Sequence, residues 1–255
     1  MEVHHHAHTE RKKFTYYLWE FLMLFIAVFC GFLAENLREH VVEIKKEKQY
    51  ISSLVRDIKA DTTMLRGIQK RYEIANRKVD TLILLLKSNE RNLETCKIYY
   101  LARTITFSYG TFLPEDQTLQ QLKSSGNLRL VHDSQIVDRI GSYYQLYTEL
   151  NNGGPGQLLS RYRHDVSLLT PELFDMIVFD KMFSSDSLFN QFHNLDSCRE
   201  KPVLFSNDPV IINKICGSYS YLKVAAKAIM TLWIPKMLGR AESLLANIKR
   251  EYHID

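Results

Sequence analysis

The chain has 255 residues, a length that suits one or two domains. Hydrophobic residues make up 45% and charged residues 24%, which excludes a disordered tail and a polytopic transporter. Only 10 glycines and 6 prolines are present, too few for an all-β fold with many tight turns, so the composition favours helices. The formal net charge is only +4 and no motif interleaves aromatic and basic residues, so nothing indicates nucleic-acid binding.

Residues 14–34 predict a transmembrane helix. They read FTYYLWEFLMLFIAVFCGFLA and contain a single charge, Glu20. About 20 apolar residues are needed to cross ~30 Å of hydrocarbon. A cleaved signal peptide is the alternative, but bulky Phe29 and Phe32 stand where a cleavage site needs small residues. We therefore expect an uncleaved signal anchor.

The basic residues on either side of this segment bear on its orientation. Arg11, Lys12 and Lys13 directly precede it, whereas Arg38, Lys45, Lys46 and Lys48 follow at a greater distance. Basic residues close to a span favour the cytoplasmic side. We expect the N-terminus in the cytoplasm and residues 35–255 outside it, which is the periplasm if the protein sits in the inner membrane of a Gram-negative cell. Tyr16, Tyr17 and Trp19 form an aromatic belt at the first interface.

Two sets of residues near the N-terminus are candidates for a functional site. Glu20 is either a functional intramembrane carboxylate, as in proton-driven stator subunits, or an interfacial acid one turn from water. We favour the second interpretation because Glu20 lies away from the midplane. The tract of His4, His5, His6 and His8 is either a metal-binding tract or a solvated tail. A short tail supplies little fixed geometry for a metal, which favours the solvated tail.

The opening of the chain also carries a resemblance. The run MEVHHHAHTERKK, followed by FTYYLWEFLMLFIAVFCGFLAEN and LREH, resembles an uncharacterised family of single-span proteins widespread in Bacteroidota. The phrase QLKSSGNLRLV at 121–131 is similar to a recurring phrase of that family. The resemblance implies a membrane protein and brings no catalytic residues.

A long amphipathic helix is expected over 35–88, where no proline occurs. Alternate steps of four and three residues give Leu37, Val41, Ile44, Lys48, Ile51, Val55, Ile58, Thr62, Leu65, Gln69, Tyr72, Asn76, Val79, Ile83 and Leu86, most of them apolar. This period is typical of a coiled-coil seam. In a second interpretation, the stripe packs against later helices of the same chain. The two interpretations can hold over different stretches of the helix.

The remaining residues, 89–255, predict further helices. These are expected over 90–106, from Pro114 onward, over 134–150, over 158–169, over 171–183 and from Pro209 onward. A loop is expected at 184–206 and a kink at Pro235. Asp133 or Ser134 is expected to cap the third of these helices. The turn at 151–156 is expected to reverse the chain rather than to bind an anion. The predicted fold class is therefore all-α, with a transmembrane helix that continues into a long amphipathic helix and an antiparallel helical bundle.

No catalytic motif is apparent. The sequence has no HExxH, no GxSxG, no P-loop and no zinc-type cysteine pair, so we expect neither an enzyme nor a cofactor. The pairs His132-Asp133 and His164-Asp165 are weak signals, since adjacent residues on a helix do not face each other. Cys30 lies in the span, and Cys96, Cys198 and Cys216 leave open either one disulfide or three buried thiols.

These features favour a non-enzymatic, single-span structural or accessory subunit of an envelope assembly. Its expected partners are the lipid bilayer and either further copies of itself or another membrane protein. One alternative is an extracytoplasmic helical ligand sensor that works through a partner. The other is a stator-like, energy-coupled subunit that uses Glu20.

Overall fold

The computed structural model describes residues 14–182 and 202–254, and this part of the chain is helical without strands. The predicted all-α fold class is confirmed. The histidine tract at 4–8 and most of the predicted loop at 184–206 lie outside the described residues. The chain divides into two compact units, residues 1–50 and residues 51–255.

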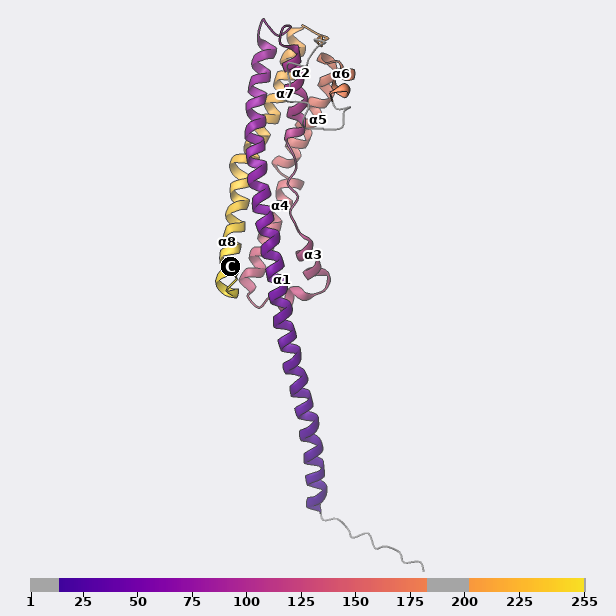
Figure 1. Cartoon of the computed structure of the whole chain (residues 1–255), viewed down its shortest axis with the longest axis vertical. Coiled ribbons are helices and arrows are strands. Elements are labelled where there is room, and N and C mark those ends of the chain that lie inside the picture. The colour runs from indigo at the N-terminus through magenta and orange to yellow at the C-terminus, as the bar shows by residue number, and fades with distance from the viewer. Residues whose placement is uncertain (1–13, 183–201, 255) are drawn as a thin grey trace, which may run out of the picture. The chain divides into compact units, whose positions relative to one another are not determined.

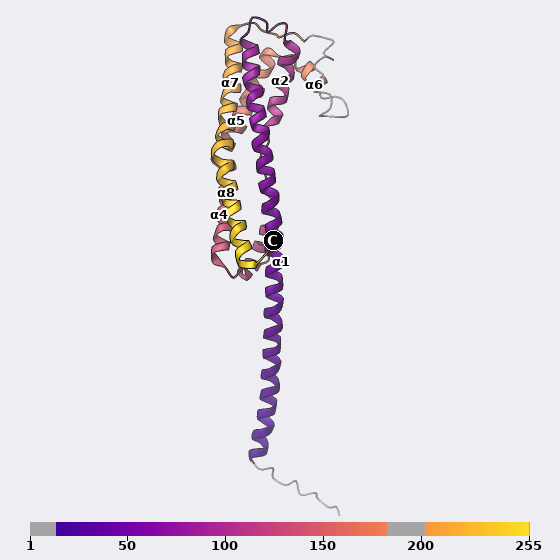
Figure 2. The ribbon, with the colours of Figure 1, turned by 60° about the vertical axis from the view of Figure 1, so that its left-hand side comes forward.

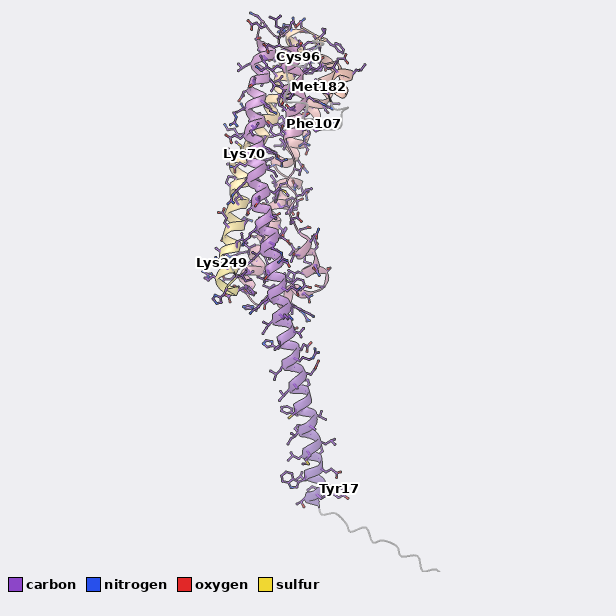
Figure 3. All side chains as sticks on the ribbon, in the orientation of Figure 1. Tyr17, Lys70, Cys96, Phe107, Met182 and Lys249 are labelled. Atoms are coloured by element: carbon purple, nitrogen blue, oxygen red, sulfur yellow. The ribbon has the colours of Figure 1, made fainter. Side chains whose placement is uncertain are left out.

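Helix α1 (Phe14–Lys87) contributes to both units. It runs without interruption, as expected from a stretch that lacks proline. Its part in the first unit contains an 18-residue window with a mean hydropathy of 2.1, none of which is buried. Figure 3 shows these side chains, among them Tyr17, on the surface of the helix. An exposed helix of this length and composition meets the requirements of a membrane span.

The second unit is an antiparallel bundle. Besides α1 from Ile51 onward, it contains α2 (Thr95–Ser108), α3 (Gln117–Ser124), the 3-10 helix η1 (Asn127–Leu130), α4 (Ser134–Asn152), α5 (Pro155–Leu173), α6 (Met176–Lys181), α7 (Pro209–Ala228), the π-helix η4 (Ile229–Trp233) and α8 (Ile234–Tyr252). Figures 1 and 2 both show α7 and α8 running alongside α1. Helix α5 packs against α7, and α4 packs against α8 and α5.

The apolar stripe of α1 forms one wall of the core of this unit. Nine of its predicted positions from Ile51 onward are buried: Ile51, Val55, Ile58, Thr62, Leu65, Tyr72, Asn76, Val79 and Leu86. The apolar residues among them join one hydrophobic cluster with the later helices. For this stretch the interpretation of internal packing holds, and the stripe is not available as a seam between chains. In the first unit, Leu37 and Val41 are 67% and 65% exposed.

Two helices start where the sequence predicts, α4 after the expected cap Asp133 and α7 at Pro209. The Asp133 carboxylate accepts a 2.8 Å hydrogen bond from the backbone N–H of Gln135 at the start of α4. The Asp208 carboxylate accepts a 2.8 Å bond from the N–H of Val210 at the start of α7, where Pro209 occupies the first turn.

Several helix boundaries differ from those expected; α3, for example, begins at Gln117 rather than at Pro114. The predicted break before Pro171 is wrong, because α5 continues to Leu173 with Pro171 in its last turn. There the missing N–H costs one backbone hydrogen bond shortly before the helix ends anyway. Helix α2 begins at Thr95 rather than at 90, after a series of turns. The predicted kink at Pro235 takes the form of the π-helix η4 directly before it, since a wider turn relieves the clash of the proline ring with the preceding backbone.

The connection from α4 to α5 reverses the chain, as expected, and depends on a glycine. A Cβ added at Gly156 would lie 2.5 Å from the carbonyl oxygen of Leu150, a backbone atom that cannot move aside easily. Glycine therefore allows the first turn of α5 to pack closely on the last turn of α4.

Candidate ligand-binding cavities

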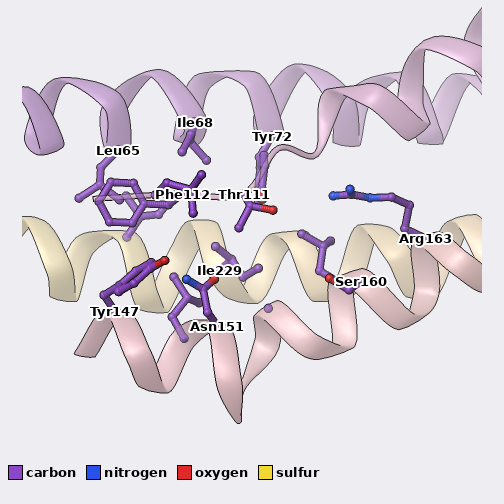
Figure 4. A pocket seen from close by; sticks show the side chains of 15 residues that line it. Leu65, Ile68, Tyr72, Thr111, Phe112, Tyr147, Asn151, Ser160, Arg163 and Ile229 are labelled. Carbon is purple, nitrogen blue, oxygen red and sulfur yellow. The ribbon is translucent and has the colours of Figure 1, made fainter. Parts of the chain in front are cut away.

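A cavity of about 260 Å³ lies inside the second unit and is named here the Tyr147 cavity. Its walls come from five parts of the bundle: Leu65, Ile68 and Tyr72 of α1, the segment 111–113, Tyr147, Leu150 and Asn151 of α4, Gly156, Leu159, Ser160 and Arg163 of α5, and Ile229 and Ile234 beside the proline kink. Figure 4 shows Leu65 and Ile68 on one side and Tyr147 and Asn151 on the other. Most of this lining is apolar.

Regular helical spacing places these side chains. Leu65, Ile68 and Tyr72 lie three and four residues apart on α1 and therefore share one face. Tyr147 and Asn151 lie one turn apart on α4 for the same reason. The π-helix η4 supplies Ile229, and single π-helical turns often occur at functional sites.

The segment between α2 and α3 closes one side of the cavity and is fixed by side chains of α1. The Tyr72 hydroxyl donates a 2.5 Å hydrogen bond to the carbonyl oxygen of Gly110. The Tyr109 hydroxyl donates a 2.7 Å bond to Oδ1 of Asn76, and its ring packs edge-on against Tyr72. Burial raises the pKa of Tyr72 to about 12, so this hydroxyl stays protonated and remains a donor.

A second cavity, of about 330 Å³, adjoins α2, α5 and α6 and is named the Phe179 cavity. Its lining includes Arg103, Phe107, Arg163 and Phe179. The guanidinium carbon of Arg103 lies 5.0 Å from the ring centroid of Phe107 and 5.5 Å from that of Phe179, which are cation–π distances. Arg163 lines both cavities and donates a hydrogen bond to the carbonyl oxygen of Tyr109, which lines the Phe179 cavity.

A buried carboxylate forms a separate polar cluster in the bundle. Asp61 is fully buried, and its two oxygens accept 2.8 Å hydrogen bonds from the backbone N–H of Glu115 and from the Tyr143 hydroxyl. Loss of hydration on burial raises the pKa of Asp61 to about 6, although both hydrogen bonds act in the opposite direction. Within the described residues Oδ2 of Asp57, one turn earlier, is buried without a hydrogen-bond partner.

The residues that the sequence singled out do not gather into one site. Glu20 is exposed in the first unit, and His4, His5, His6 and His8 lie outside the described residues. The described part of the chain holds no group of three or more histidines, cysteines, aspartates or glutamates that would suit a metal. His132 Nε2 lies 3.3 Å from Oε1 of Glu251 rather than facing Asp133.

The cysteines differ in state. Cys96, at the start of α2 (Figure 3), is disulfide-bonded, whereas Cys30 and Cys216 are free thiols. Cys216 is buried in the core, and burial raises the pKa of its thiol. Of the two possibilities left open by the sequence, one disulfide is therefore correct.

Sequence reasoning missed Asp61 and Arg163. A usable signal existed for Asp61, because it lies three residues after Ile58 and four before Leu65, on the apolar face of α1. A carboxylate at such a position indicates a buried polar cluster. Arg163 carries no comparable signal, since its surroundings depend on how the segment 109–113 folds back.

Comparison of the chain with protein-family models, with curated proteins and with solved structures gave no match.

Proposed function

We propose that this chain is a single-pass membrane protein and a non-enzymatic accessory subunit of an envelope assembly. The resemblance to single-span Bacteroidota proteins implies the first part of this proposal, the membrane protein. The observation that carries the proposal is the fully exposed apolar part of α1, with its mean hydropathy of 2.1. In water such a surface would associate or aggregate, whereas in a bilayer it is solvated. Residues 14–34 are the span, and the bundle is the working domain.

The orientation proposed is N-terminus in the cytoplasm and bundle in the periplasm. Arg11, Lys12 and Lys13 support it, because basic residues next to a span are retained on the cytoplasmic side. The disulfide at Cys96 supports it independently, since disulfides persist in oxidising compartments and are rare in the cytosol.

The surface of the bundle supports a role in assembly. On α7, Tyr221 and Val224 lie one turn apart and are 61% and 62% exposed, and the Tyr221 ring stacks on Tyr162 of α5. Leu158 and Leu168 of α5 are exposed as well. Exposed apolar side chains on two helices that pack against each other suit contacts with other proteins.

The test is gentle extraction from native membranes, followed by determination of the mass and composition of the complex. A stoichiometric second protein or a homo-oligomer of defined size is expected. A variant with Tyr221→Glu and Val224→Glu should lose that association, whereas Leu84→Glu, at an exposed position of α1, should retain it. A monomer from both the wild type and the variants would contradict the proposal.

Ligand sensing is the second candidate, and the Tyr147 cavity is the observation that favours it. The cavity is mostly apolar with a few polar groups at its edge, which is the usual composition of a small-molecule site. A bound ligand would raise the melting temperature in proportion to its excess over Kd.

A further inference from the structure

Within the described residues, Arg163 is a cation without a carboxylate partner. It has five N–H donors, one of which is used by the carbonyl oxygen of Tyr109. Among the residues that the structure describes, no carboxylate forms an ion pair with it, and its Nε is buried without a hydrogen-bond partner. Partial burial of a guanidinium whose N–H donors are not all used costs free energy, unless an anion accepts hydrogen bonds from them.

A second arginine lies nearby. The guanidinium of Arg71 lies 3.8 to 4.0 Å from the position that a Cβ on Gly110 would take, so the absence of a side chain at Gly110 leaves it room. Arg71 and Arg163 both act to lower the pKa of the Tyr72 hydroxyl against the larger effect of burial. The end of the Tyr147 cavity next to Tyr72 is therefore electropositive.

The rest of the cavity is mostly apolar, with Thr111, Asn151 and Ser160 as its other polar residues. Leu65 and Ile68 of α1, Leu150 of α4 and Ile229 of η4 line it, and Phe112 packs edge-on against Tyr147 with ring centroids 5.8 Å apart. In Figure 4 the Arg163 side chain extends from α5 toward the Tyr72 side of this space. The cavity thus has a cationic end and an apolar body, with a volume of about 260 Å³ that suits a small molecule.

We propose that the Tyr147 cavity binds a small amphipathic carboxylate, with its carboxylate on the Arg163 guanidinium and its apolar part between α1, α4 and η4. An arginine fork matches the two oxygens of a carboxylate, and one partly buried cation matches one negative charge. A neutral ligand of the same shape would leave the Arg163 guanidinium without a counterion. A small inorganic anion would leave the apolar part of the cavity unfilled. The proposal deepens the ligand-sensing candidate and does not depend on the accessory role.

The test is isothermal titration of the full chain in lipid nanodiscs, with empty nanodiscs as the blank for partition into lipid. The probes are 3-phenylpropionate, 4-phenylbutyrate and octanoate, with 3-phenylpropanol as the neutral analogue and propionate as the anion without an apolar body. At least one of the three amphipathic carboxylates is expected to bind saturably. The neutral analogue is expected to bind at least about tenfold more weakly, because a charge-assisted hydrogen bond is lost.

Three variants identify the site. Arg163→Gln should weaken carboxylate binding by about 10- to 100-fold, and Arg163→Lys should weaken it less because the charge remains. Arg161→Gln, an exposed arginine on the same helix, is the charge-matched control and should bind as the wild type does. Arg163 also donates a hydrogen bond to the Tyr109 carbonyl oxygen, so its substitution affects the fold as well as the cavity. Arg71→Gln is therefore added as a variant at an exposed position, and it should weaken carboxylate binding by about threefold.

Absence of binding by all three carboxylates up to about 10 mM would overturn the proposal. Equal affinity for the neutral analogue, or unchanged binding by a folded Arg163→Gln protein, would overturn it as well. None of these results would bear on the accessory role, which is read from the mass of the extracted complex.

Discussion

The Tyr143 hydroxyl donates a 2.8 Å hydrogen bond to the carboxylate of Asp61 inside the bundle, 82 residues away in the chain. The contact joins α4 to α1, and the backbone N–H of Glu115 donates a second hydrogen bond to the same carboxylate. Both hydrogen bonds stabilise the ionised acid, yet burial outweighs them and raises the pKa of Asp61 to about 6. The stability of the bundle is therefore coupled to pH.

The first prediction concerns Asp61→Asn. The folded state binds the Asp61 proton more tightly than the unfolded state, whose pKa is near the usual 3.8. The free energy of unfolding of the wild type should thus fall as pH rises from about 4 to about 6. Asp61 should account for roughly 3 kcal/mol of this fall, and above about pH 6 it should cause no further change. The asparagine variant should lack this contribution, as measured by denaturant unfolding between pH 4 and pH 8.

Parallel pH profiles of the wild type and Asp61→Asn would contradict that prediction. Tyr143→Phe is the companion variant, because it removes a donor to the carboxylate and leaves the ring in place. It should cost about 1.5 to 3 kcal/mol above pH 6, where the acid is ionised, and less below pH 4.

The second prediction separates the two faces of α1. Ile58 is fully buried, so Ile58→Ala should lower the free energy of unfolding by about 2 to 5 kcal/mol through lost burial and a residual cavity. Ile74, on the same helix, is 40% exposed, and Ile74→Ala should cost well under that. Equal losses in urea titrations of the two variants would show that the stripe does not pack inside the bundle.

Much of this fold could be predicted from local signals. The continuous helix from Phe14, the cap at Asp133 and the start at Pro209 each depend on residues close together in the chain. The sequence left open what covers the stripe of α1, because its period fits a partner chain and the chain's own helices equally well. The fold settles that question from Ile51 onward by burying the stripe.

The cavities could not be predicted in the same way. The surroundings of Arg163 depend on the carbonyl of Tyr109, which comes from a segment 54 residues away and without regular structure. No local period encodes such a contact. Only Asp61, a charge on an apolar helix face, carried a readable sign of the polar cluster around it.

The third prediction concerns two glycines with opposite surroundings. A Cβ at Gly156 would meet the carbonyl oxygen of Leu150 at 2.5 Å, so Gly156→Ala should destabilise the fold by about 1 to 3 kcal/mol. At Gly217, inside α7, nothing lies within 4 Å of such a Cβ, and Gly217→Ala should stabilise the fold by about 0.5 to 1 kcal/mol. Thermal unfolding of both variants checks the sign of each effect.

The fourth prediction concerns thiol reactivity. In the folded, oxidised protein, Cys96 should not react with a maleimide because it is disulfide-bonded, and Cys216 should not react because it is buried. Mild reduction should expose Cys96, whereas Cys216 should react only after unfolding. Mass spectrometry of peptides after each step shows which cysteine has been labelled. Labelling of Cys96 before reduction would contradict the prediction.

The most direct measurement for the account as a whole is labelling of single introduced cysteines in cells with a permeabilised outer membrane. Lys70→Cys and Lys249→Cys lie at exposed positions of the bundle, and Glu10→Cys precedes the span. A membrane-impermeant maleimide should label the first two while the inner membrane is intact, and Glu10→Cys only after that membrane is opened, with the wild type as background. Labelling of Glu10→Cys alone in intact inner membranes would contradict the proposed topology, and release of the protein from membranes by carbonate would contradict the span itself.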